Sequence, residues 1–338
     1  MNLLITGGAG FLGARLARTL LARGTLAGRA IGRVALADLV APQDAALRDD
    51  ARVQAHVGDL PALLPELMRT RFDAVFHLAS AVSAECEADF DLGMHANLDG
   101  TRALLEACRA QAAAGGPVAR LVFSSSVAVF GNDPDLPLPP VVDDRTLPTP
   151  QSSYGIQKFV CEQLVADYTR KGFLDGRSAR LMTVSVRPGR PNGAASGFLS
   201  GIVREPLAGV PAVCPVEADT AVALASPAST VAGLIAVAEA GRAALGGRTA
   251  LNLPALTVTV RQMLEALRAV GGEAAASLVR FEPDEAIGRI VRSWPARIDA
   301  TRARRLGLTP DGDFGAIVLQ YVRDHPDAVA NAQARADD

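Results

Sequence analysis

Tyr154 and Lys158 are the residues whose types and spacing most clearly predict chemistry in this sequence. They stand four positions apart at the start of a helical pattern, so a helix would place both side chains on one face. A phenol ordinarily has a pKa of about 10, and a nearby ammonium group favours its ionised form. Such a pair can accept the proton of a substrate hydroxyl. The same spacing also arises by chance in exposed helices, so other segments must support this interpretation.

A serine cluster ends the apolar run that precedes this pair in the chain, Ser124-Ser125-Ser126. Buried hydroxyls cost free energy unless they are hydrogen-bonded, so three in succession need partners. We predict that Ser126 hydrogen-bonds the substrate oxygen and completes the site, with Ser125 as the second candidate. The alternative is that these hydroxyls only complete the hydrogen bonds at the strand end.

A glycine turn follows the first apolar run, with Gly7, Gly10 and Gly13 in the spacing GxxGxxG. Glycines lack Cβ atoms, so backbone N–H groups can approach a pyrophosphate at the positive end of a helix. The position between a strand and a helix favours a dinucleotide site over a plain tight turn. We predict that this site includes Phe11 and Leu12. A nicotinamide ring there would take a hydride while Tyr154 takes the proton, and Lys158 could also hold the nicotinamide ribose.

Residues at the ends of the next strands extend the predicted cofactor site. Asp38 ends the second strand, where a carboxylate accepts hydrogen bonds from an adenosine ribose and repels a 2′-phosphate, so we expect NAD rather than NADP. The alternative for Asp38 is a solvated turn residue. Asp59, followed by Leu60, either accepts from the adenine amino group or caps a helix. The end of the fourth strand, where small residues let a cofactor lie close, adds Leu78, Ala79 and Ser80.

The elements that must position these residues alternate between short apolar runs and longer helical patterns. The predicted strands are Asn2–Thr6, Arg33–Ala37, Val53–Val57, Ala74–Leu78, Arg120–Ser124 and Leu181–Arg187. The predicted helices are Leu12–Arg23, Met94–Ala113 and Tyr154–Lys171. This alternation predicts an α/β fold with a doubly wound parallel sheet of the Rossmann type over residues 1–187. The pattern changes after Arg187, so residues 188–330 should form a smaller substrate-binding region, with one strand near 250–253 returning to the sheet.

Composition argues against several other functional classes. The chain has 338 residues and a formal net charge of −2, with Lys and Arg scattered, so we expect no nucleic-acid partner. Its four cysteines and four histidines lack ligand spacing, so we expect no metal site. No apolar run approaches the ~20 residues of a membrane helix, and the N-terminus resembles no secretory signal. We therefore expect a cytoplasmic protein without membrane contact.

Five motifs together resemble the extended short-chain dehydrogenases, the family that includes sugar-nucleotide epimerases and dehydratases. In chain order, these motifs are Thr6–Gly13, Asn97–Thr101, Ser124–Gly131, Tyr154–Lys158 and Arg187–Gly189. The resemblance implies that Ser126, Tyr154 and Lys158 are catalytic and that Asn97 supports the site. It also implies that Pro188 contacts the nicotinamide end of the cofactor, and we predict that Ser124 and Ser125 bind the cofactor as well. Relatives often dimerise through two long helices, so we expect a homodimer.

Several segments, among them Ser80–Glu85 and Ser293–Pro295, resemble those family members that oxidise a small sugar acid at its 2-hydroxyl with NAD. A carboxylate substrate needs a cation, and arginine offers a fork that can bind it bidentately. Arg187 and Arg190 are the best-placed candidates, although either could be structural. The predicted partners of the substrate hydroxyls are Ser80, Ser83, Ser126 and Asn192.

Two other functions remain open at this point. The first is an NAD-dependent sugar-nucleotide epimerase or dehydratase, which net NADH production would distinguish because an epimerase returns its hydride. The second is a non-catalytic protein that senses the cofactor on the same fold. The complete Ser126, Tyr154 and Lys158 set favours an enzyme, because a sensor does not need it.

Overall fold

The computed structural model describes residues 1–189 and 196–330, and its centre is a seven-stranded parallel sheet with the order β12-β8-β7-β6-β1-β4-β5. In that order the strands are Leu251–Asn252, Asp175–Leu181, Arg120–Ser126, Ala74–His77, Asn2–Thr6, Arg33–Asp38 and Val53–Val57. The strand order reverses at β1, so the crossovers on its two sides leave toward opposite faces of the sheet. The predicted α/β class with a doubly wound parallel sheet is confirmed.

The sixth strand lies earlier in the chain than predicted. We expected it at Leu181–Arg187, but β8 pairs with β7 over 175–181, and the following apolar run joins a different sheet as β9 (Thr183–Val184). The wrong prediction has a physical cause, because β8 carries two arginines that are nevertheless buried. Arg177 is paired with Asp175 at 2.6 Å, and Arg180 with Glu162 at 2.7 Å.

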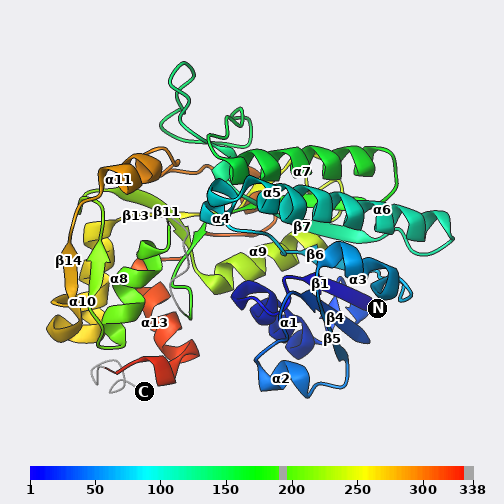
Figure 1. Cartoon of the computed structure of the whole chain (residues 1–338), viewed down its shortest axis with the longest axis horizontal. Coiled ribbons are helices and arrows are strands. Elements are labelled where there is room, and N and C mark those ends of the chain that lie inside the picture. The colour runs from blue at the N-terminus through cyan, green and yellow to red at the C-terminus, as the bar shows by residue number, and fades with distance from the viewer. Residues whose placement is uncertain (190–195, 331–338) are drawn as a thin grey trace.

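Helices cover both faces of the sheet (Figure 1). On one face, α1 (Phe11–Arg23) and α9 (Pro227–Glu239) bury their leucines against the strands. On the other face lie α3 (Leu60–Leu67), α6 (Gly100–Ala113) and α7 (Ser153–Arg170). The shorter elements between them are β2 (Thr25–Leu26), β3 (Arg29–Ala30), α2 (Ala45–Arg48), α4 (Ser83–Ala88), α5 (Phe90–Gly93), the π-helical turn η1 (Met94–Asp99) and the 3₁₀ turn η2 (Val127–Val129).

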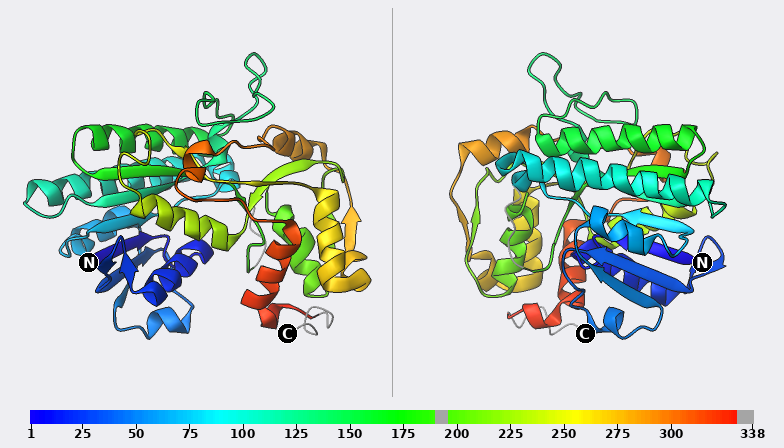
Figure 2. Two further views of the ribbon diagram at one scale, coloured as in Figure 1. Left: turned by 180° about the vertical axis from the view of Figure 1, so that it is seen from behind. Right: turned by 45° about the vertical axis from the view of Figure 1, so that its right-hand side comes forward.

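A second group of elements, the C-terminal lobe, stands to one side of the sheet and has its own apolar core (Figure 2). Its strands form a three-stranded sheet, β13-β11-β9, and a separate pair, β10 with β14. The bounds of the new elements are α8 (Phe198–Leu207), β10 (Ala212–Cys214), β11 (Ala221–Ala225), β13 (Leu256–Thr259), α10 (Val260–Ala276), β14 (Val279–Phe281), α11 (Glu285–Arg292), α13 (Phe314–Asp324) and η3 (Pro326–Ala328). Residues after 188 contribute to both cores, because α9 packs against the central sheet and β12 is one of its strands.

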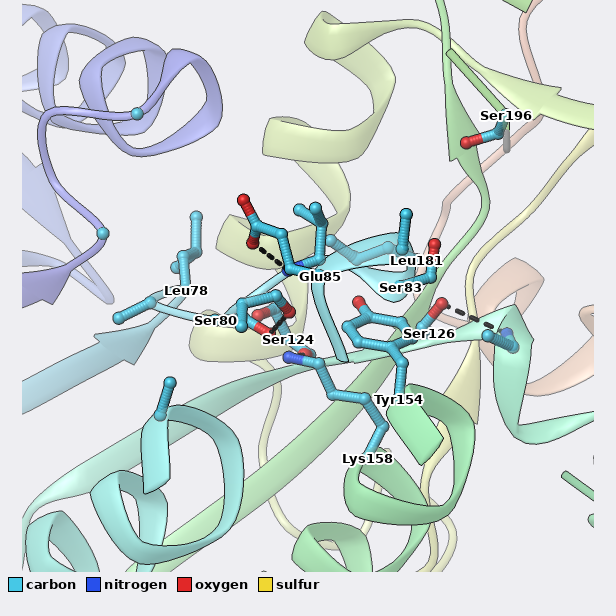
Figure 3. A pocket seen from close by; sticks show the side chains of 18 of the residues that line it. Leu78, Ser80, Ser83, Glu85, Ser124, Ser126, Tyr154, Lys158, Leu181 and Ser196 are labelled. Carbon is cyan, nitrogen blue, oxygen red and sulfur yellow. Dashed lines mark hydrogen bonds between the residues drawn. The ribbon is translucent and has the colours of Figure 1, made fainter. Parts of the chain in front are cut away.

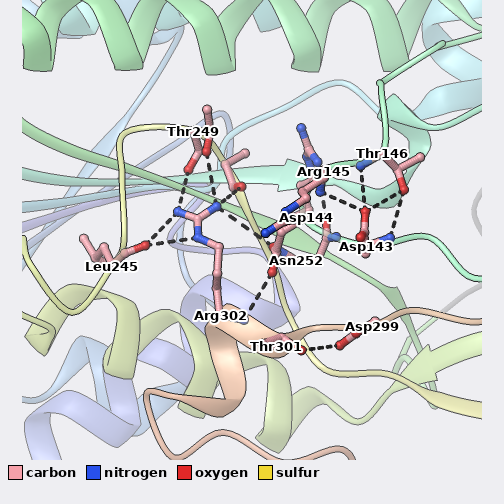
Figure 4. Close-up of polar contacts among 12 residues, drawn as sticks. Asp143, Asp144, Arg145, Thr146, Leu245, Thr249, Asn252, Asp299, Thr301 and Arg302 are labelled. Atoms are coloured by element: carbon pink, nitrogen blue, oxygen red, sulfur yellow. Dashed lines mark hydrogen bonds and ion pairs between the residues drawn. The ribbon is translucent and has the colours of Figure 1, made fainter.

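A polar cluster ties the C-terminal segment to the edge of the central sheet (Figure 4). Asp144 accepts hydrogen bonds from the backbone N–H of Asn252 on β12 at 3.3 Å and of Arg302 on α12 (Thr301–Arg304) at 3.1 Å. The Arg302 guanidinium donates to the backbone carbonyls of Leu245, Thr249 and Ala250. Two distant segments, those of Asp144 and Arg302, are therefore fastened beside β12. Across residues 1–189 and 196–330, the structure has no helix with the length and apolar character to cross a bilayer.

Candidate active site

A cavity of about 1410 Å³ opens along the carboxyl ends of the central strands and continues toward the C-terminal lobe. Open parallel sheets bind ligands at this edge, where the strand order reverses. Its wall contains residues from the glycine turn, from the ends of β4, β6 and β7, from α7 and from α11. The cavity therefore runs from the glycine turn after β1 to the side chains of the C-terminal lobe.

The glycine turn is shaped for close approach. Gly7 has a φ of +69°, and a Cβ there would lie 2.7 Å from the backbone nitrogen of Ala79. A Cβ on Gly13 would lie 2.1 Å from the carbonyl oxygen of Gly7, so α1 could not start so near β1 with any larger residue. Gly10 is the N-cap of α1 and supplies no side-chain cap, which leaves the first N–H groups of the helix turned toward the cavity. This cradle fits a dinucleotide pyrophosphate.

Two carboxylates, Asp38 and Asp59, line the part of the cavity that lies beside β4 and α3. Asp38 accepts a hydrogen bond from the backbone N–H of Ala9 at 2.9 Å, which fixes it beside the glycine turn. Asp59 precedes α3 but makes no capping bond; its carboxylate instead lies 3.2 Å from Nε2 of His95. The position of Asp38 fits a ribose with free hydroxyls. Phe11, Leu12, Leu60, Leu78 and Ala79 also line this part of the cavity.

Tyr154 and Lys158 lie in the first turns of α7, facing the cavity (Figure 3). The Ser152 hydroxyl caps this helix by accepting from the N–H of Gly155 at 3.1 Å. Lys158 is buried; its Nζ donates to the carbonyl of Ser124 at 2.9 Å and lies 5.5 Å from the centre of the Tyr154 ring. A Cβ at Gly155 would lie 2.2 Å from the carbonyl oxygen of Ala128, so this glycine allows α7 to approach the end of β7.

The three serines of β7 have different partners. Ser124 donates to the carbonyl of His77 at 2.9 Å, and Ser125 donates to Oε1 of the buried Glu162 at 2.5 Å. Ser126 accepts from the N–H of Ala128 at 3.1 Å and lines the cavity together with Tyr154 (Figure 3). Ser126 is thus the serine whose hydroxyl remains able to donate to a bound oxygen. Ser125, the second candidate, is committed to Glu162.

Asn97 and His77 lie outside the cavity wall and make hydrogen bonds to residues that line it. Asn97, in the π-helical turn, does not line the cavity; its Oδ1 accepts from the Ser80 hydroxyl at 2.9 Å and from the N–H of Ala81 at 2.8 Å. His77 on β6 lies between the hydroxyls of Thr6 and Thr101. Burial, with a smaller contribution from the charge of Lys158, lowers the pKa of His77 to about 3. His77 is therefore neutral, and sequence reasoning missed it.

Arg187 lies at the substrate end of the cavity. Its Nε donates to the carbonyl of Val184 at 2.9 Å and its Nη2 to the hydroxyl of Ser196 at 2.7 Å. Burial lowers the pKa of this guanidinium, and electrostatic attraction to Tyr154 acts in the opposite direction. No carboxylate in the described ranges pairs with Arg187, so its charge is available to an anion. Pro188 does not line the cavity, and the other predicted candidates, Arg190 and Asn192, lie outside the described residues.

The C-terminal lobe closes the substrate end with side chains that the sequence analysis did not identify. These are Phe198, Ile287, Ile290, Ser293 and Trp294. Ser80 and Ser83, predicted to meet substrate hydroxyls, line the same cavity (Figure 3). Ser293–Pro295 contributed only to a resemblance, since a lone tryptophan far along the chain carries no local signal that it lines a cavity. The arrangement can hold a dinucleotide beside a small anionic alcohol.

Comparisons with known proteins agree with this geometry. Residues 3–218 match the NAD dependent epimerase/dehydratase family. The chain is 52% identical to a D-erythronate dehydrogenase of Cupriavidus necator, over 96% of this chain and 98% of the relative. It is 45% identical to a D-erythronate dehydrogenase of Haemophilus influenzae, over 95% of this chain and 99% of the relative.

Solved structures show the same fold. A nucleoside-diphosphate-sugar epimerase from Agrobacterium tumefaciens superposes with a TM-score of 0.90 at 42% identity, covering 97% of this chain and 95% of that one. A GalE-like L-threonine dehydrogenase from Cupriavidus necator superposes with a TM-score of 0.80 at 23% identity, covering 96% and 99%. The family match and the two nearly full-length relatives confirm the resemblance found in the motifs: the chain belongs to the NAD dependent epimerase/dehydratase family, the extended short-chain dehydrogenases.

Proposed function

We propose that the protein is an NAD-dependent dehydrogenase that oxidises the 2-hydroxyl of a small sugar acid to the 2-oxo acid, with D-erythronate as the first candidate substrate. The observation that carries this proposal is the Arg187 guanidinium, which has no carboxylate partner in the described residues and lines the same cavity as Tyr154. A cation so placed favours an anionic alcohol. The relatives named D-erythronate dehydrogenase support the same substrate class.

In the proposed reaction, each residue has one task. The glycine cradle and Asp38 would hold NAD, which supplies the hydride acceptor when bound. Tyr154 takes the proton of the substrate hydroxyl, Lys158 holds a positive charge beside the phenol, and Ser126 donates a hydrogen bond to the oxygen that becomes a carbonyl. Arg187 binds the carboxylate, while Ser80 and Ser83 meet the remaining hydroxyls. The hydroxyl proton thus leaves through Tyr154 as the C–H bond loses its hydride.

The carboxylate at Asp38 also supports the choice of cofactor. A 2′-phosphate would place its negative charge beside this side chain, which the N–H of Ala9 holds in place. No arginine follows directly to neutralise such a phosphate, because Leu39 and Val40 occupy the next positions. We therefore propose NAD rather than NADP.

The test is a screen for NADH formation with D-erythronate, other three- to six-carbon sugar acids and the matching neutral sugars, with NAD and NADP in parallel. We expect NADH from a short sugar acid with NAD. A second candidate, a sugar-nucleotide epimerase, is favoured by the similarity to the Agrobacterium tumefaciens protein, which is named a nucleoside-diphosphate-sugar epimerase. Conversion of a sugar nucleotide without net NADH would support the epimerase and contradict the dehydrogenase.

We further propose that the protein is a homodimer that pairs through the outer faces of α6 and α7. Ile156 and Val160, both on α7, are 50% and 38% exposed although they are large and apolar. A second copy would remove them from water. Light scattering should give twice the mass of the chain, and I156K/V160K should lower it to that of one chain.

A further inference from the structure

A buried ion pair lies behind the catalytic residues and takes no part in the proposed reaction. Arg180 on β8 donates from Nε to Oε1 of Glu162 at 2.8 Å and from Nη2 to Oε2 at 2.7 Å. Both side chains are almost completely removed from solvent, with relative exposures of 6% and 1%. This bidentate geometry fixes α7 against β8 at one relative position.

The pair is linked to the catalytic residues on two sides. Glu162 stands four positions after Lys158 on α7, so it lies one helical turn further along the same face. Its Oε1 also accepts from the hydroxyl of Ser125, which sits between Ser124, whose carbonyl holds Lys158, and Ser126. One carboxylate therefore fastens both the helix and the strand end that carry the three predicted catalytic side chains.

Arg180 is itself held from two further directions. Its guanidinium lies 4.8 Å from the centre of the Phe130 ring, which also lines the cavity. Its Nη1 is 3.5 Å from Oδ1 of Asn252 on β12. The charged group thus has contacts from the turn after β7 and from the edge strand as well as from Glu162.

Burying an ion pair contributes little net stability, because the cost of desolvating both ions offsets their attraction. A positional role is therefore the better explanation of its place in the fold. We infer that Glu162 and Arg180 are positioning residues that hold Ser126 on β7 in register with Tyr154 and Lys158 on α7. The inference rests on the proposed function, since it assigns the pair to the geometry of that site.

The matched control lies on the same strand. The Arg177 side chain is as buried as that of Arg180, at 2% against 6% relative exposure, and it also pairs with a carboxylate, Asp175. It faces the opposite side of the sheet, where it donates to the carbonyls of Val237 and Ala238 on α9. R177K and R180K therefore make the same chemical change at equal depth, but only R180K lies behind the site.

In kinetic assays of the full-length protein, R180K should lower kcat about 10- to 100-fold, because lysine loses the bidentate fork and a small misplacement of reacting groups is costly. The KM for the sugar acid and the Kd for NADH should change by no more than about twofold, while R177K should leave kcat within about twofold of wild type. S125A should lower kcat less than R180K, because it removes one hydrogen bond and no charge. Equal losses in R180K and R177K would overturn the inference, since they would reflect stability alone.

A second measurement does not depend on activity. The chain has three tyrosines. Burial and Glu106 raise the pKa of Tyr168 to about 12, and burial raises that of Tyr321. In an ultraviolet absorbance titration, the step that disappears in Y154F belongs to Tyr154.

E162Q removes a negative charge about 12 Å along α7 from Tyr154 and leaves Arg180 without its counter-ion. Relative to wild type, the step that Y154F removes should then move to lower pH by about half a unit to one unit. Every charge is kept in S125A, R177K and R180K, so these variants should not change the pH of that step. The other groups that interact electrostatically with Lys158, Tyr154 or Arg180 stay the same in all variants: His77, Cys86, Cys161, Arg187 and Arg302.

The two measurements separate the possible failures. If wild type oxidises no sugar acid, the proposed function is wrong, and the titration of E162Q against wild type still decides whether the pair lies within electrostatic reach of the phenol. If E162Q does not fold, R180K against R177K decides. An unmoved titration in folded E162Q, or R180K with wild-type kcat, contradicts the positioning role.

Discussion

Replacing Arg187 by methionine should turn a selective acid dehydrogenase into one that ignores the substrate carboxylate. An arginine has five N–H donors, and two of these already bond Val184 and Ser196. The free donors on Nη1 and Nη2 can make two charge-assisted hydrogen bonds, each worth about 1.5 kcal/mol. Losing both costs about 3 kcal/mol, which is about a 100-fold fall in kcat/KM.

The assay compares D-erythronate with its neutral amide for wild type and for R187M. Wild type should prefer the acid by about 100-fold, and R187M should show almost no preference, because the lost interaction needs both partners. The amide itself should be oxidised at a similar rate by both proteins. An R187M variant that loses the same factor on acid and amide would refute the reasoning, since its defect would then lie in the shape of the site rather than in carboxylate recognition.

Three further predictions concern the base, the cofactor and acid stability. Y154F should lower turnover by about 10²–10⁴-fold with NAD affinity retained, measured by initial rates and fluorescence titration; near-full activity would remove Tyr154 from its role. D38S/L39R should lower the ratio of NAD to NADP use, because it replaces the repelling carboxylate; an unchanged ratio would contradict the assignment of Asp38. His77, whose pKa is lowered to about 3 in the folded protein against about 6.5 when unfolded, should take up a proton on unfolding below pH 6.5. The free energy of unfolding should therefore fall from pH 6.5 downward by up to about 1.4 kcal/mol per pH unit, and H77N should show a flatter dependence in urea titrations.

The features that the sequence predicted are those with local signals. The strand–turn–helix at residues 2–23 carries its glycines in a fixed spacing, and the Tyr154–Lys158 pair lies within one helical turn. Side chains alternate along a strand, and the structure accordingly turns Ser125 away from its two serine neighbours and toward Glu162. Short sequence motifs were therefore sufficient to predict much of the cofactor cradle and of the candidate site.

The features that the sequence did not predict depend on contacts between distant segments. The arginines of β8 look unsuitable for a buried strand until Asp175 and Glu162 are seen to pair with them. The side chains of Ile287 and Trp294 reach the cavity only because the lobe stands beside the sheet. No periodicity within either segment encodes those partners.

The fastening of β12 by Asp144 and Arg302 bears on how the chain folds during synthesis. β8 stays an open edge until residues 251–252 pair with it, and Arg302 adds its bonds later still. An emerging polypeptide that stopped before these residues would expose unpaired backbone groups, which invite pairing with another chain. Closure of the sheet must therefore wait until most of the polypeptide has left the ribosome, and prematurely terminated products should aggregate rather than accumulate as a stable Rossmann fragment.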